Sequence, residues 1–121
     1  MIGDDCNIQD SVVIHALGGT GVRIGPVTSV AHDAIIYGPC QIARGYFVGF
    51  NSVVFGATLG EGSVVMHHGL VEAVSVPGHL HIASMTAVRS QDDVKDLPAV
   101  TPDIAAFVNK VRQTNLCLVE A

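Results

Sequence analysis

The chain has 121 residues, enough for one domain with a core of its own. Its formal net charge of −5 argues against a nucleic-acid partner, and no apolar run is long enough to span a membrane. Hydrophobic residues make up 49% but aromatic residues only 5%, a balance typical of β structure built from thin, branched side chains. Three widely separated cysteines, Cys6, Cys40 and Cys117, lack metal-type spacing and fit reduced thiols, so we expect a cytoplasmic protein.

Aliphatic residues recur about every six positions over most of the chain. A Gly-rich interruption at 18–21 and two steps of five break the count. The rival fold, a sandwich of short strands, has no reason to hold a period of six, whereas a triangular solenoid requires it. The repeat positions are Ile2, Ile8, Ile14, Ile24, Val30, Ile36, Ile42, Val48, Val54, Leu59, Val65, Val71, Val76, Ile82 and Val88.

Three such rungs per coil predict a left-handed parallel β-helix of about five coils over residues 1–90, an all-β solenoid. A small or turn-forming residue follows the first rung of each coil, where we expect the chain to bend. These residues are Gly3, Gly25, Ala43, Gly60 and Pro77.

The repeat stops after Val88, and the polar residues that follow predict a connecting loop over 91–100. Thr101, Pro102 and Asp103 then form a helix start, with an N-cap, a proline in the first turn and an acidic residue. We therefore predict a C-terminal helix over 101–121 that packs on the prism. Its apolar stripe is Ile104, Phe107, Val108, Val111 and Leu118.

The repeat frame places side chains in columns. His15 and Tyr37 hold the same place in adjacent coils, so we expect them to stack about 5 Å apart. His32 lies in another column, with Asp10, Phe50 and His67. One prism puts His15 and His32 on different faces. They meet only where two copies pack side by side, as in a ring with three-fold symmetry.

The stretches Asn-Ile-Gln-Asp-Ser-Val-Val-Ile-His at 7–15, Ala-His-Asp-Ala-Ile-Ile-Tyr-Gly-Pro at 31–39 and Phe-Val-Gly-Phe-Asn-Ser-Val-Val-Phe at 47–55 closely resemble the gamma-class carbonic anhydrases. They also resemble the carbonic-anhydrase-like domain of carboxysome organising proteins. The resemblance extends from Ile2 to about Val88 and resumes at 107–109. It implies a homotrimer that holds zinc, or another divalent metal, between subunits with three histidines.

The resemblance carries the first metal ligand to His15 and the neighbouring subunit's ligand to His32. The third ligand falls on Tyr37, where this sequence departs from the family pattern. Three neutral nitrogens let zinc lower the pKa of bound water to about 7. A phenol, with a free pKa of about 10, must ionise before it binds and then adds negative charge that opposes this effect. Tyr37 as an interface packing residue is the alternative.

The same resemblance assigns three catalytic positions. Gln9 matches the residue that hydrogen-bonds metal-bound water or bicarbonate, and Asn109 matches a polar active-site residue on the helix. Asp10 matches the partner of an arginine from an upstream strand that has no counterpart here. The loop that carries a proton-shuttle glutamate is replaced by the Gly-rich turn. His67 and His68 are alternative ligands or shuttles.

Three functions remain open at this stage. The first is a lyase that hydrates CO2 to bicarbonate, the second is a catalytically inactive structural or assembly trimer without metal, and the third is a hexapeptide-repeat acyltransferase. The long loop typical of such acyltransferases is absent from the sequence. A first coil that begins at Ile2 leaves an unpaired strand edge. We therefore expect this coil to be covered, by a partner or by end-to-end association of two trimers.

Overall fold

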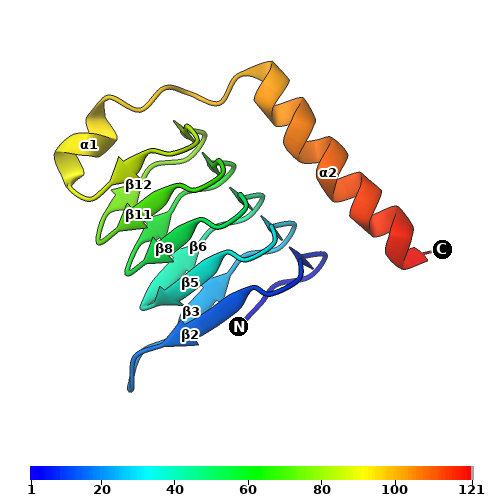
Figure 1. Cartoon of the computed structure of the whole chain (residues 1–121), viewed down its shortest axis with the longest axis horizontal. Helices are drawn as coiled ribbons and strands as arrows, with labels where there is room; N and C mark the ends of the chain where they lie inside the picture. The colour runs from blue at the N-terminus through cyan, green and yellow to red at the C-terminus, as the bar shows by residue number, and fades with distance from the viewer. Residues whose placement is uncertain (121) are drawn as a thin grey trace.

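The computed structural model describes the backbone of residues 1–120 and the side chains of residues 1–113. Short parallel strands stack into the coils of a solenoid, as Figure 1 shows, and each full coil contributes one strand to each of three sheets. The predicted parallel β-helix of about five coils with a C-terminal helix is confirmed. Predictions for the side chains of Cys117 and Leu118, and for Ala121, lie outside the described residues.

The three sheets form the three faces of the prism, and we name them by what lies outside each. The helix-covered sheet has the order β1 (Asn7–Ile8), β4 (Ser29–Val30), β7 (Phe47–Val48), β10 (Val64–Val65) and β13 (His81–Ile82). The aromatic sheet contains β2 (Val13–Ala16), β5 (Ile35–Gly38), β8 (Val53–Phe55), β11 (Leu70–Glu72) and β14 (Ala87–Val88). The polar sheet contains β3 (Val22–Ile24), β6 (Cys40–Ile42), β9 (Thr58–Leu59) and β12 (Ser75–Val76).

The repeating aliphatic side chains point into the prism. From Ile24 to Val88, all of these side chains are at most 2% exposed. In the first coil, Ile2 and Ile8 are 49% and 37% exposed, because no earlier coil packs on them in the structure. Burial of this continuous ladder is the main stabilising contribution to the fold.

A second inward position, two residues before the ladder residue in each rung, holds Tyr46. Its side chain is fully buried, and its hydroxyl has no hydrogen-bond partner within the described structure. Burial raises the pKa of the Tyr46 phenol far above its ordinary value, because the ionised form would lose its hydration. Tyr46 is therefore a neutral core residue.

The small residues at the start of each coil allow the next coil to pack closely against them. A Cβ atom on Gly60 would lie 2.3 Å from the main-chain nitrogen of Gly78, and one on Gly25 would lie 2.7 Å from that of Arg44. The main-chain atoms of the next coil occupy this space. Small residues are therefore needed here for the close approach of two coils, and not only for the bend that the sequence predicts. Left-handed backbone conformations occur at other corners, including Val27 with a φ of 62°.

The stretch predicted as a connecting loop begins with a short helix, α1 (Gln91–Lys95). Ser90 caps α1 through a capping box with Asp93, and Val94 is buried against the last coil. Residues 98–100 then pair with 79–81 through hydrogen bonds of 2.8 Å from the His81 amide to the Pro98 carbonyl and from the Val100 amide to the His79 carbonyl. This stretch therefore covers the C-terminal end of the solenoid.

The C-terminal helix α2 (Pro102–Glu120) runs alongside the coils in Figure 1. The Thr101 hydroxyl accepts a hydrogen bond of 3.3 Å from the Ile104 amide and caps the first turn, as the sequence indicates. The rings of Phe107 and Phe47 pack edge to face, with ring centroids 5.8 Å apart. Since Phe47 lies on β7, α2 covers the helix-covered sheet.

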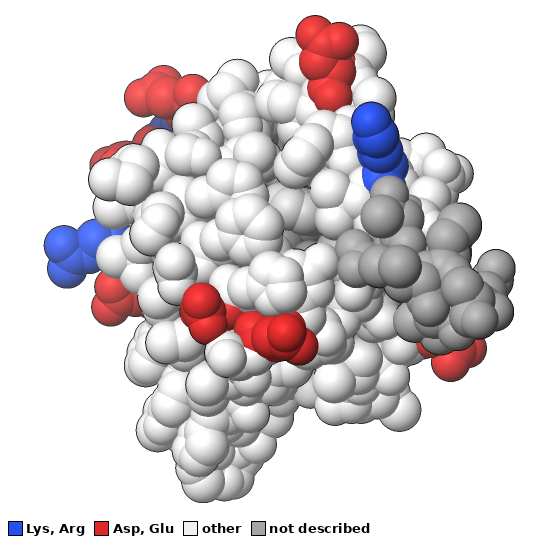
Figure 2. Space-filling view, turned by 45° about the vertical axis from the view of Figure 1, so that its right-hand side comes forward, with Lys and Arg blue, Asp and Glu red and all other residues white. Residues whose placement is uncertain are grey.

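Two surface properties bear on partners. Figure 2 shows scattered acidic side chains and few basic ones on the face in view, with no continuous basic patch there. Within the described part of the chain, no helix combines the length and the apolar character needed to cross a membrane.

Candidate intersubunit site

Aromatic rings form a stack on the outside of the aromatic sheet. Strand register aligns His15 with Tyr37 and Tyr37 with Phe55. The ring centroids are 5.0 Å apart in the first pair and 5.1 Å apart in the second, with interplanar angles of 27° and 8°. The predicted stacking of His15 on Tyr37 is thus present. We call His15, Tyr37, Phe55 and Glu72, which register places next, the aromatic column.

A second stack, the corner column, contains His32, Phe50 and His67. His32 lies 5.7 Å from Phe50 between ring centroids, and Phe50 lies 4.5 Å from His67. All three residues follow strands of the helix-covered sheet, at the turn toward the aromatic sheet. The column predicted from the repeat frame is therefore present, while Asp10 joins it through its main chain.

His32 accepts a hydrogen bond at Nδ1 from the Asp10 main-chain amide, at 3.1 Å. A neutral imidazole that accepts at Nδ1 carries its proton on Nε2. In this tautomer Nε2 is a donor and has no lone pair for a metal, since a ligand through Nε2 needs the proton on Nδ1. Asp10 thus orients His32 through its amide, whereas its exposed carboxylate makes no part of this contact.

Within one copy of the chain, the described residues of the two columns do not come together as a metal centre. His15 and Tyr37 lie on the strands β2 and β5, whereas His32 lies in the turn that precedes β5. Among the residues whose side chains are described, no group of three His, Cys, Asp or Glu side chains could hold a metal ion. A metal site that uses side chains of both columns would therefore need a second copy of the chain.

Gln9 and Asn7 present polar atoms that are unpaired within the described chain. Both residues are half-buried, and the Gln9 Oε1 and Asn7 Nδ2 atoms are inaccessible to solvent without a hydrogen-bond partner. A buried polar atom without a partner costs about 1–3 kcal/mol. Such atoms indicate a place where a ligand, a water molecule or a neighbouring chain completes the structure.

Asn109, which the resemblance assigns to the site, belongs to neither column. Its Oδ1 accepts a hydrogen bond of 2.7 Å from Arg112 Nη2 on the same helix. It lines a hollow of about 260 Å³ under α2, together with Val27, Gly45 and His79 among others. The structure therefore places Asn109 against the turns of its own chain.

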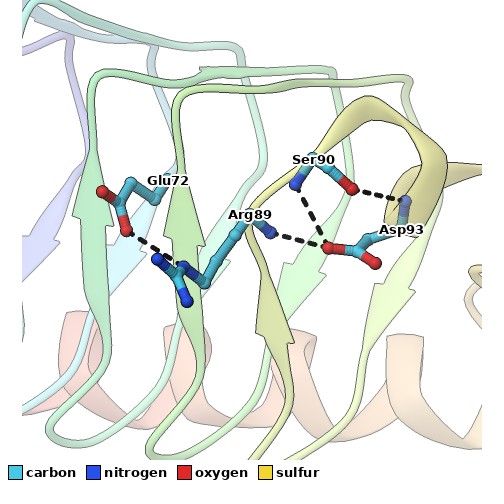
Figure 3. A network of polar contacts seen from close by, with 4 residues as sticks. All are labelled: Glu72, Arg89, Ser90 and Asp93. Atoms are coloured by element: carbon cyan, nitrogen blue, oxygen red, sulfur yellow. Dashed lines mark hydrogen bonds and ion pairs between the residues drawn. The ribbon is translucent and has the colours of Figure 1, made fainter.

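A polar network lies beyond Phe55 in the aromatic column, and Figure 3 shows its members. Glu72 Oε2 lies 3.6 Å from Arg89 Nε, and the amides of Arg89 and Ser90 donate to Asp93 Oδ2 at 3.0 and 3.1 Å. These hydrogen bonds lower the pKa of the Asp93 carboxyl, the bond from the Arg89 amide most of all. The sequence pattern gives no indication of this network.

The last residue of the corner column, His67, accepts a hydrogen bond from a main-chain amide. The Phe50 amide donates to His67 Nδ1 at 3.0 Å, as the Asp10 amide does to His32. Burial, followed by the nearby charge of His68, lowers the pKa of His67. His67 is therefore a neutral imidazole with its proton on Nε2.

The sequence matches curated proteins, although no protein-family profile matches it. It is 35% identical to the carboxysome assembly protein CcmM of Nostoc sp. over 97% of this chain and 23% of that protein, and 37% identical to CcmM of Synechocystis sp. over 91% and 18%. It is 29% identical to a carbonic anhydrase of Methanosarcina thermophila over 86% of this chain and 50% of that enzyme. The chain thus spans about a fifth of the CcmM proteins and half of the enzyme.

Solved structures support the fold. A hexapeptide transferase family protein from Anaplasma phagocytophilum superposes with a TM-score of 0.77 over 97% of this chain and 65% of its own, at 23% identity. At that identity the likeness establishes the fold alone. The chain is homologous to CcmM and to gamma-class carbonic anhydrases, and is a gamma-carbonic-anhydrase-like protein of the hexapeptide-repeat type.

Proposed function

We propose that this chain forms a homotrimer that serves as an assembly module, with intersubunit sites that keep the layout of a carbonic anhydrase but hold no catalytic metal. The observation that supports this proposal is the stack of Tyr37 on His15, at the position to which the resemblance assigns the third ligand. The relatives whose alignments cover more than 90% of this chain are carboxysome assembly proteins by name. An assembly role needs the shape of the trimer and not its chemistry.

The donor set does not fit a catalytic zinc ion. In a three-histidine site the neutral ligands leave the charge of zinc intact, so that it can acidify bound water, whereas Tyr37 offers a phenol that binds only when ionised. His32 presents a protonated Nε2, because the Asp10 amide occupies Nδ1. Two of the three ligand positions therefore oppose binding, one through its chemistry and one through its tautomer.

The trimer is supported by the outside of the aromatic sheet. Val13, Ile35 and Phe55 are exposed there, and Phe50 is exposed at the adjoining corner. A contiguous apolar patch on a soluble protein marks an interaction surface. A second copy is the occupant that brings His32 to His15 and Tyr37, and repetition of this heterologous contact about a three-fold axis closes a ring.

Residual CO2 hydration is the second candidate, and Gln9 favours it. Its buried Oε1 has no partner within the described chain, and an amide oxygen can accept a hydrogen bond from a nucleophilic water. In an enzyme Gln9 would orient that water, while a bound metal would supply the acidity. An assembly trimer explains the same atom by contact with the neighbouring chain.

Metal analysis and CO2 hydration assays on the purified trimer separate these candidates. We expect a trimer by mass photometry, less than one metal ion per ten chains after gel filtration in zinc, and hydration at the background rate. Tyr37→His should raise bound zinc, and Tyr37→Phe, the matched control that keeps the ring stack, should not. One zinc per site with hydration by the unmodified chain would overturn the assembly proposal in favour of the enzyme.

A further inference from the structure

The two columns match each other coil by coil. His32 and Tyr37, Phe50 and Phe55, and His67 and Glu72 are each five residues apart, because the segment that joins the corner column to the aromatic column has the same length in these three coils. Each coil therefore presents one member of the corner column and one of the aromatic column. The pairs are polar with polar, aromatic with aromatic, and again polar with polar.

A three-fold axis parallel to the prism keeps every residue at its own height. In the proposed trimer the corner column of one chain faces the aromatic column of the next, so residues of the same coil meet. If His32 lies beside Tyr37 of the neighbour, Phe50 lies beside Phe55. Two coils away from the first pair, His67 lies beside Glu72.

His67 has a side-chain donor, Nε2–H, that makes no hydrogen bond within the described residues. Because the Phe50 amide donates to Nδ1 at 3.0 Å, the proton of the neutral ring is on Nε2, at the opposite side of the imidazole. The ring is held between this hydrogen bond and the stack on Phe50, with centroids 4.5 Å apart. A donor fixed in this way loses little side-chain entropy on binding.

Glu72 is the complementary acceptor. Its side chain is 42% exposed, and its contact with Arg89, itself 69% exposed, is long at 3.6 Å and involves Oε2. An exposed ion pair of this kind contributes little to stability, so the carboxylate can accept a further hydrogen bond. Figure 3 shows Glu72 on the strand next to Arg89, away from the Ser90 and Asp93 capping contacts.

We propose that Nε2–H of His67 donates a hydrogen bond to the Glu72 carboxylate of the neighbouring chain. This inference rests on the proposed trimer and adds to it a second polar contact, which favours the closed ring over an open assembly whose subunits are shifted along the prism. The Phe50 and Phe55 level between the two polar levels is apolar, so a shift by one coil would place a carboxylate against a phenylalanine ring. Such a shift would bury a charge without a partner.

A double-mutant cycle on the full chain tests this contact. His67→Asn keeps an acceptor near the Phe50 amide but removes the outward donor, and Glu72→Gln removes the charge. By sedimentation, each change should raise the concentration at which half of the trimer dissociates about tenfold, since each trimer contains three such contacts. The double variant should be no weaker than the weaker single variant, because both changes remove one contact.

Matched controls are His68→Asn and Glu61→Gln, which change exposed neighbours of the same types, and Arg89→Gln, which removes the ion pair within the chain. All three should shift the midpoint less than about twofold. Independent effects of His67→Asn and Glu72→Gln, or no effect, in a protein that is a trimer would overturn the contact alone. A monomeric unmodified chain would overturn the proposed trimer and the contact together.

The nitrogen chemical shifts of His67 give a measurement that does not depend on the His67 variant folding. The unmodified trimer should show the tautomer with the proton on Nε2, and Glu72→Gln should shift the Nε2 resonance and leave that of His32 in place. A proton on Nδ1, or an Nε2 signal that is insensitive to Glu72→Gln, would contradict the proposal.

Discussion

The aromatic sheet and the polar sheet share one core and one backbone lattice, but their outer surfaces differ. Outside the aromatic sheet lie stacked rings and exposed aliphatic side chains, among them His15, Tyr37 and Ile35. Outside the polar sheet lie Arg23, Gln41 and other short or polar side chains, beside a row of small residues. The inward residues therefore specify the fold equally on both faces, and the outward residues alone distinguish the proposed interface from the polar face.

A carboxylate placed on each face should give the largest difference between them. Ile35→Glu puts a charge on β5, on the outside of the aromatic sheet, where the proposed trimer would bury it without a partner. We expect the dissociation midpoint of the trimer to rise on the order of 100-fold by sedimentation. Gln41→Glu, the matched change on the polar sheet, should leave the midpoint unchanged. Equal effects at the two positions would remove the distinction between the faces.

The small residues beside the polar sheet should be sensitive in folding and not in assembly. Gly60→Ala places a methyl group 2.3 Å from the Gly78 main-chain nitrogen, so that two coils must separate. We expect the free energy of unfolding in urea to fall by about 2–3 kcal/mol. Gly18→Ala is the control, because a methyl group there meets no atom within 4 Å. A tolerated Gly60→Ala would show that the coils are less closely stacked than the structure indicates.

The fold could be predicted because burial requires strict spacing. If Ile36 or Val54 were shifted by one position along the chain, its side chain would point out of the core. The aliphatic residues must therefore keep a period of six, which the sequence shows directly. The same register predicts that His15 stacks on Tyr37, which the structure contains. Helix α1 was missed because its only buried residue is Val94, which gives no apolar period, although a capping box precedes it.

The site was less predictable, because it depends on main-chain atoms. The positions of His15, His32 and Tyr37 follow from the repeat, but the tautomer of His32 depends on where the Asp10 amide points. No side-chain pattern encodes that direction. Residue types show which groups could bind a metal, whereas the hydrogen bond determines which lone pair is available.

Tyr46 lies in the interior that both faces share, so a change there should affect folding and not assembly. Tyr46→Phe removes a buried hydroxyl that has no partner in the described structure. We expect the free energy of unfolding to rise by about 1 kcal/mol, with the dissociation midpoint unchanged. A loss of stability would mean that an internal water or an undescribed group satisfies the hydroxyl.

Tyr46 should also make the free energy of unfolding depend on pH. The pKa of Tyr46 is raised in the folded state above its ordinary value of 10.0, so the stability that it contributes is complete below pH 10.0 and declines as the pH rises above that value. Only the unfolded chain then releases the proton. Urea unfolding followed between pH 9 and 11 should show this decline in the unmodified chain and a smaller decline in Tyr46→Phe. Parallel pH profiles would assign the alkaline loss to other groups.

The smallest expected effect concerns the edge of the polar sheet. The Gln91 side-chain amide donates to the Ser75 carbonyl at 2.8 Å and accepts from the Ser75 amide at 3.2 Å, so it replaces one peptide group of a further coil. Because both bonds are exposed to water, Gln91→Ala should cost about 0.5 kcal/mol. Gln91→Glu should cost more, since it keeps the acceptor but sets a carboxylate against the Ser75 carbonyl. Gln41→Ala on the same sheet should be neutral in urea unfolding, and an equal loss there would attribute the effect to the residue type and not to the edge.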